Sequence, residues 1–343
     1  MNNKVSNGIF KWDAARVKQF LMDKTIYIVI LVIFFVMAFV NPNLIRLSNI
    51  EFIINQAATR IIFALGMGGI ILIGTIDVAQ GRVIGMAGVV IASLTQALDN
   101  SRRIYDFQLP VIVSITGVVL LCGAVMLIIG LIIARMHIPP FIATLSFSLI
   151  IFGLVSIYFD AVNDSSPIAG LDGAFKNIAQ GGFRFLGMRI SYLVLFAAAA
   201  SLIIWFIWNK TVLGKNMYAV GGNSEAAHIC GVNIAKTICT VFFIAGLLYG
   251  LGGILETGRV GSATSGLGFG YELDAIASCV VGGVSMRGGA GKVSGIIVGV
   301  LIFQLITFGL TFLGVNPYLQ FLFKGVIILF AISVDTQKNL KRT

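Results

Sequence analysis

The sequence predicts an all-α, polytopic integral membrane protein with about ten transmembrane helices. Its 343 residues are 58% hydrophobic and only 11% charged, and the mean hydropathy is +0.98. In soluble domains about a quarter of the residues are charged, so this composition excludes a soluble globular protein. In addition, apolar runs of the length that crosses a bilayer as a helix, about 20 residues, recur from one end of the chain to the other.

Ten such runs follow one another, and the connections between them are too short for a separate soluble domain. The runs are 25–41, 52–74, 82–98, 109–134, 139–159, 189–208, 236–256, 272–286, 292–313 and 317–334. The run at 272–286 is short enough to re-enter the membrane instead of crossing it. The chain then divides into an N-terminal segment 1–24, a transmembrane domain 25–335 and a basic tail 336–343.

The N-terminal segment 1–24 has an amphipathic pattern. Phe10, Ala14, Val17 and Leu21 fall on one helical stripe, and lysines lie elsewhere on the helix. Such a segment is expected to lie flat on an anionic membrane surface. A charged anchor that only sets the topology is an equally good interpretation.

The basic residues, which give the chain a net charge of +10, are unevenly distributed along it. Fifteen lysines and arginines occur on alternate connections, among them Arg82, Arg135 and Lys210, against seven on the remaining connections. This bias predicts that the basic side, which includes both termini, faces the cytoplasm. The charge therefore indicates orientation in a lipid bilayer and not nucleic-acid binding.

No catalytic or metal-binding pattern is found in the sequence. The stretch MRGGAGKVSG (286–295) resembles a phosphate-binding loop, but Met286 replaces the first glycine and Val293 the final serine or threonine. We expect a tight turn between two helices there. The four cysteines and two histidines have no ligand-like spacing. The sequence predicts a non-enzymatic chain without a metal or cofactor of its own.

Polar residues inside apolar spans are the candidates for a translocation pathway. Arg60 and Lys324 must have partners inside the protein, which the sequence does not identify. Asp77 follows the second span, where it either caps a half-helix beside the pathway or simply holds a turn. The remaining candidates could equally serve as interhelical hydrogen bonds. The candidate pathway residues are Asn55, Gln56, Thr59, Asp77, Gln304 and Thr307.

A short polar stretch, AVGGNSEAAHICGVN (219–233), interrupts the apolar sequence on a predicted cytoplasmic connection, 209–235. Asn223 or Ser224 can cap a helix, Glu225 then lies in its first turn, and Gly231 can end it in the left-handed conformation. A helix of about two turns is unstable alone in water, so it requires a surface to dock on.

Small residues surround this predicted helix. Ala226 and Ala227 permit close approach of another surface, and Gly221 and Gly222 are expected to let the loop turn sharply. From these residues alone, a docking element and an ordinary connecting loop are about equally good interpretations.

The residues Glu225-Ala226-Ala227, followed after three residues by Gly231, resemble the EAA-x3-G coupling element of ABC importer permeases. Three further stretches are similar to signatures of the monosaccharide branch, which includes ribose, xylose and galactose permeases. They are PPFIATL (139–145), GYELDAIASCVVGG (270–283) and GVNPYLQ (314–320). The resemblance extends over about 25–337.

Within this branch the likeness is strongest to galactose/methyl-galactoside permeases. It is carried by RVIGMAGVVIASLTQALDN (82–100), SPIAGLDGAF (166–175) and ETGRVGSAT (256–264). Other members show an IDLS-x-G pattern, whereas this chain has Ala79 in place of the serine. We therefore do not predict a contact between Asp77 and the substrate from this resemblance.

The resemblance implies a permease subunit of an ATP-driven importer in the bacterial inner membrane. Two copies would form one pore, a cytoplasmic ATPase with fused tandem nucleotide domains would bind the coupling element, and a periplasmic or extracellular binding protein would deliver the sugar. ATP and Mg²⁺ would be bound by the ATPase. The expected sugar is galactose or a methyl galactoside. An ion-coupled secondary transporter of a small polar solute is the alternative, and Asp77 would be its coupling residue.

Overall fold

The computed structural model describes residue 39 and residues 46–101, 103–107, 109–185 and 188–340, and this part is mostly helical. Six of its helices are long and apolar enough to cross a membrane, which confirms the predicted helical membrane protein at this level. The amphipathic segment 1–24 and, apart from residue 39, the predicted span 25–41 lie outside the described residues. The six helices are α2 (Leu47–Leu72), α4 (Val111–Met136), α5 (Pro140–Asn163), α7 (Tyr192–Lys210), α10 (Ile234–Val260) and α12 (Val293–Phe312).

Two predicted spans form shorter helices. Runs 82–98 and 272–286 correspond to α3 (Gln80–Leu94) and α11 (Tyr271–Val281). At 1.5 Å per residue these helices are about 22 and 16 Å long, less than the ~30 Å of a hydrocarbon core. Helix α13 (Pro317–Leu340) extends beyond the predicted 317–334 into the expected tail, because no proline or glycine follows residue 334.

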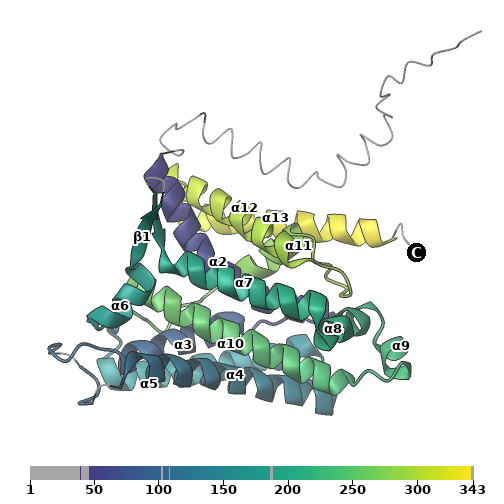
Figure 1. The fold of residues 1–343 in the computed structure, drawn as a ribbon, viewed down its shortest axis with the longest axis horizontal. Helices are drawn as coiled ribbons and strands as arrows, with labels where there is room; N and C mark the ends of the chain where they lie inside the picture. Colours follow the sequence, from purple (N-terminus) through teal and green to yellow (C-terminus); the bar gives the residue numbers. More distant parts are fainter. Residues whose placement is uncertain (1–38, 40–45, 102, 108, 186–187, 341–343) are drawn as a thin grey trace, which may run out of the picture.

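The helices form a bundle with different structures at its two ends (Figure 1). One end has α6 (Gly173–Gln180) and an antiparallel hairpin of β1 (Gly182–Phe185) and β2 (Met188–Ser191). The other end has α8 (Val212–Gly222) and α9 (Ser224–Ile229), and α13 ends on the same side. The hairpin was not predicted, because strands of four residues are too short to show an alternating pattern.

Glycines allow the central helix α10 and helix α12 to approach their neighbours closely. A Cβ atom added to Gly246 would lie 2.5 Å from the carbonyl oxygen of Cys122 on α4. One added to Gly295 would lie 2.1 Å from the carbonyl oxygen of Gly282, just after α11. At these contacts the glycines therefore form the surfaces through which the helices pack.

Helix α3 begins at half the depth of the bundle. After α2 ends at Leu72, the chain turns back, and the Gln80 side-chain amide donates to the carbonyl oxygen of Phe63, nine residues before that end (3.0 Å). The Arg82 guanidinium lies 4.1 Å from the ring centre of Phe152, in the middle of α5. The assignment of Arg82 to a cytoplasmic connection is therefore wrong, because the chain folds back into the bundle before α3 starts.

Candidate functional site

The short helix α9 has the cap and the end that the sequence predicts. The side-chain oxygen of Asn223 accepts a hydrogen bond from the backbone N–H of Ala226 (2.9 Å), so the helix begins at Ser224. Gly231 has φ +83°, and the N–H of Val232 donates to the carbonyl oxygen of Ala227 (3.0 Å). This is the left-handed termination expected for Gly231.

The two sides of α9 have different surroundings. Ala227 is buried against the bundle, with 4% of its surface exposed. Glu225 and Ala226 are exposed, and Ile229 is 85% exposed. An exposed isoleucine beside an acidic side chain, on a helix too short to be stable alone, is suited to contact with another protein.

Gly221 and Gly222 do not form the sharp turn that was expected. Both are the last residues of α8, and the chain turns at Asn223 instead (φ −161°, ψ 105°). Gly221 is required for packing, because an added Cβ would lie 1.9 Å from the carbonyl oxygen of Leu72 at the end of α2. At Gly222 an added Cβ would meet nothing within 4 Å.

Helix α8 is attached to the bundle through the turn between α11 and α12. The hydroxyl of Tyr218 donates to the carbonyl oxygen of Gly291 (2.9 Å), and the N–H of Gly289 donates to the carbonyl oxygen of Leu72 (2.8 Å). Gly288 has φ +87°, and residues 286–292 form the tight turn that was predicted, whereas Val293 already begins α12. Helix α8 is thus linked to the turn before α12, and this turn is linked to the end of α2.

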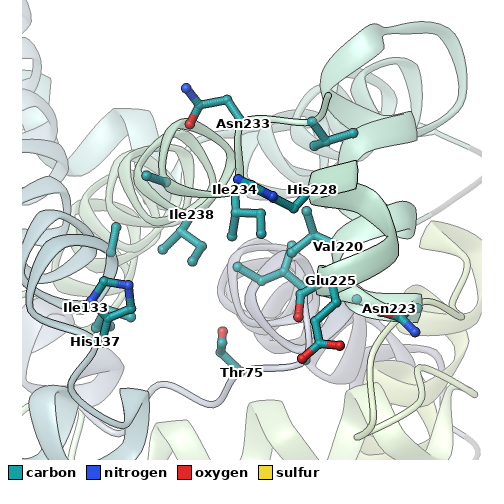
Figure 2. Close-up of a pocket in the computed structure, with 18 of the residues that line it drawn as sticks. Thr75, Ile133, His137, Val220, Asn223, Glu225, His228, Asn233, Ile234 and Ile238 are labelled. Carbon is teal, nitrogen blue, oxygen red and sulfur yellow. The ribbon is translucent and has the colours of Figure 1, made fainter. Parts of the chain in front are cut away.

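An open groove of about 1090 Å³ lies beside α9 (Figure 2). Glu225 and His228 extend from the α9 side, whereas Thr75 and His137 belong to the opposite wall, formed by the connection after α2 and the end of α4. Apolar side chains such as Ile238 complete the lining. The groove has the mixture of apolar and polar groups suited to a protein segment.

Away from the α9 groove, five of the candidate pathway residues lie on α2 and α12, which are neighbours in the bundle. Rings of Phe52 on α2 and Phe308 on α12 lie with their centres 5.5 Å apart, so the two helices pack together there. Thr307 donates to the carbonyl oxygen of Phe303 in its own helix (3.0 Å). Helix α2 contains Asn55, Gln56 and Thr59, and α12 contains Gln304 and Thr307.

A buried carboxylate, Glu256 of α10, joins α2, α10 and α11. It accepts hydrogen bonds from the Thr59 hydroxyl (2.8 Å), the Tyr271 hydroxyl (3.1 Å) and the Arg259 guanidinium (2.8 and 3.0 Å). The Arg60 guanidinium lies 4.0 Å from the same carboxylate and 3.4 Å from the ring centre of Tyr271. Glu256 is thus the partner of Arg60 that the sequence did not identify.

Lys324 also has a partner. Its ammonium group donates to both carboxylate oxygens of Asp274 on α11, at 2.8 and 3.0 Å. Sequence reasoning missed Glu256 and Asp274 as partners. Pairing each basic residue within a predicted span with the few acidic residues in other spans would have suggested both, since a charge in the membrane interior requires a counter-charge.

Asp77 lies apart from the other candidates. Its carboxylate accepts a hydrogen bond from the N–H of Ala79 (2.8 Å) just before α3. The residue is fully buried. This hydrogen bond holds the connection between α2 and α3, and a role of Asp77 in the pathway stays a prediction.

A bundle of six helices long and apolar enough to cross a membrane is the architecture of a multi-pass membrane protein. The chain belongs to the family described as branched-chain amino acid transport system / permease component, whose model matches residues 49–332. The chain is thus a non-catalytic permease component of a transport system, and it is a multi-pass protein of the bacterial inner membrane.

Its relatives are named as sugar permeases. The galactose/methyl galactoside import permease protein MglC of Haemophilus influenzae is 44% identical over 324 residues, which is 94% of this chain and 96% of the relative. The MglC protein of Escherichia coli K12 is 43% identical over 325 residues, with the same coverage. The ribose import permease protein RbsC of Escherichia coli K12 is 33% identical over 324 residues, again 94% and 96% of the two chains. The comparison with solved structures found no match.

Proposed function

We propose that this chain is the permease subunit of an ABC importer that moves galactose or a methyl galactoside into the cytoplasm. The observation that carries the proposal is the helix α9, which exposes Glu225, Ala226 and Ile229 on an element attached to the ends of the spanning helices. The relatives named as galactose/methyl galactoside import permeases support the choice of sugar.

In the proposed complex, two copies of this chain form the pore and a cytoplasmic ATPase with fused tandem nucleotide domains binds the α9 end. ATP and Mg²⁺ are bound by the ATPase. A periplasmic or extracellular binding protein delivers the sugar to the end of the bundle with α6 and the hairpin. The proposed coupling residues are Gly221, Asn223, Glu225, Ala226, Ala227 and Gly231, whereas Gly222 of the same loop has room for a side chain and is not assigned a coupling contact.

The proposed coupling follows the contacts of α8. When the ATPase domains move, they displace α9, and α8 moves with it because Asn223 joins the two helices directly. The close contact of Gly221 with Leu72 then transmits the displacement to α2. Helix α2 contains the polar residues Asn55, Gln56 and Thr59, which we propose to line the pathway together with Gln304 and Thr307 of α12.

The experiment is co-purification of the tagged chain with its ATPase, together with galactose uptake by proteoliposomes that contain the complete complex. The variant Glu225→Lys places a positive charge on α9, and we expect it to lose the ATPase while remaining inserted. Asp99→Lys makes the same charge change on an exposed residue of the connection that pairs, through Gln96, with Leu171 just before α6, and it should keep the ATPase. If neither the native chain nor the control binds an ATPase, or if uptake stops with an uncoupler while ATP remains high, the proposal is wrong.

A further inference from the structure

We propose that a small cavity between α2, α11 and α12 receives one hydroxyl group of the transported sugar, with Arg60 and Gln304 as hydrogen-bond donors. This inference rests on the proposed function as a sugar importer and names the groups that would recognise the sugar. It concerns the cavity beside Asp274, which shares no lining residue with the groove beside α9.

The cavity has a volume of about 20 Å³, which is enough for one water molecule or one hydroxyl oxygen. Its polar lining comes from three helices, with Arg60 on α2, Asp274 and Ser278 on α11, and Gln304 on α12. The remaining lining is mostly aromatic and includes Phe63, Tyr271 and Phe303. A few polar groups among aromatic rings is the usual composition of a small-molecule site.

Two donors at this cavity have no acceptor among the described residues. They are the side-chain nitrogen Nε2 of Gln304, a residue that is only 6% exposed, and the nitrogen Nη1 of Arg60. Buried donors without an acceptor are unfavourable, so such groups are normally satisfied by water or a ligand.

The other polar groups at the cavity already have partners. The Asp274 carboxylate is held by Lys324, and the Ser278 hydroxyl donates to the backbone carbonyl oxygen of Asp274 (2.7 Å). The unsatisfied groups are therefore donors, and the occupant that fits them supplies an oxygen with lone pairs.

The surrounding charges favour the same kind of occupant. The two separate groups of ion pairs near the cavity contain the cations Arg60, Arg259 and Lys324 but only the anions Glu256 and Asp274. The excess is one positive charge, and it lies on the side of Arg60, whose distance to Glu256 is the longest of the three pairs. A cationic solute is disfavoured here, whereas the oxygen of a neutral hydroxyl group is attracted.

The cavity lies close to the proposed pathway. Gln56 is one helical turn before Arg60 on α2, and Thr307 is one turn after Gln304 on α12. The side chains of Asp274 and Lys324 are each 20% exposed, so this cluster reaches the surface of the subunit. A sugar that passes along α2 and α12 can therefore insert one hydroxyl group while its carbon face contacts an aromatic ring.

The experiment measures uptake of galactose and of each of its monodeoxy derivatives by proteoliposomes with the ATPase and with the binding protein saturated. Gln304→Leu removes the donor with little change in volume, and Arg60→Lys keeps the charge but removes Nη1. The control is Thr116→Val on α4, an exposed residue whose hydroxyl donates only to the carbonyl oxygen of Ile112 in its own helix.

The native complex should transport one monodeoxy derivative about tenfold more slowly than galactose, because that derivative lacks the anchored hydroxyl group. The Gln304→Leu and Arg60→Lys complexes should transport galactose as slowly as the native complex transports that derivative. They should therefore no longer distinguish galactose from the derivative, and the ATPase should still co-purify with them. If both variants discriminate as the native complex does, the cavity holds only a structural water and the inference is wrong. If the native complex transports no galactose, it is the proposed function that fails.

Discussion

At the scale of single residues, Glu256 joins three helices through its buried carboxylate. Three hydrogen-bond donors and a second guanidinium converge on its carboxylate, which is fully buried. Removal of one member of such a network leaves buried charges without compensation, and this costs more than the loss of a surface ion pair.

We expect Glu256→Gln to destabilise the protein by about 3 kcal/mol, because Arg60 and Arg259 then lose their counter-charge. The measurement is the thermal unfolding midpoint of the purified protein in detergent. The double variant Glu256→Gln with Arg259→Gln should recover part of the loss, since one of the two cations is removed. An unchanged midpoint in the single variant would contradict this account of the network.

Asp77 has a different environment. Its carboxylate is fully buried and accepts a hydrogen bond from the N–H of Ala79. Asp77→Asn keeps the acceptor for Ala79, so we expect near-native stability and uptake, whereas Asp77→Leu should cost about 2 kcal/mol. Uptake assays combined with unfolding midpoints test this. A folded Asp77→Asn variant without uptake would indicate that the charge itself works in transport, as in the ion-coupled alternative.

At the scale of elements, the contact between α8 and α2 decides how the α9 end can act on the spanning helices. The contact depends on one glycine, because the backbone of α2 ends directly against Gly221 while Gly222 faces open space. The two adjacent glycines therefore form a matched pair for an experiment.

We expect Gly221→Ala to separate α8 from α2 and to lower uptake about tenfold, at a cost of about 1–3 kcal/mol in stability. Gly222→Ala introduces the same methyl group without a contact and should transport normally. Both variants should be measured for uptake and for ATP hydrolysis in the same proteoliposomes. Equal uptake by the two variants would show that the α8–α2 contact is not needed for coupling.

At the scale of the whole molecule, the exposed cysteine Cys230 reports on docking at the α9 end. It follows α9 directly and is exposed, whereas Cys122 and Cys279 are buried and Cys239 is half-buried. In membranes without the ATPase, we expect a maleimide to label Cys230 readily.

Binding of the ATPase should protect Cys230, and the label should be absent from the variant Cys230→Ser. Labelling rates in inverted membrane vesicles, with and without the ATPase, provide the measurement. Equal rates in both preparations would mean that the ATPase does not cover α9.

The sequence by itself determined the class of protein and most of its helices. Long apolar runs have few alternatives to spanning helices, because backbone groups in lipid must be hydrogen-bonded within the chain. The cap at Asn223 and the left-handed Gly231 were equally predictable, since both are local properties of a few consecutive residues.

Only the tertiary structure decided which distant residues meet. Arg82 was assigned to a connection from its place in the sequence, but the chain turns back after α2 and brings it beside Phe152. Glu256 and Arg60 are almost two hundred positions apart, and no local pattern records their contact. The same holds for Gly221, whose need to be small comes from the end of α2. Helix propensity and hydropathy act over a few turns, whereas these contacts depend on how whole helices pack.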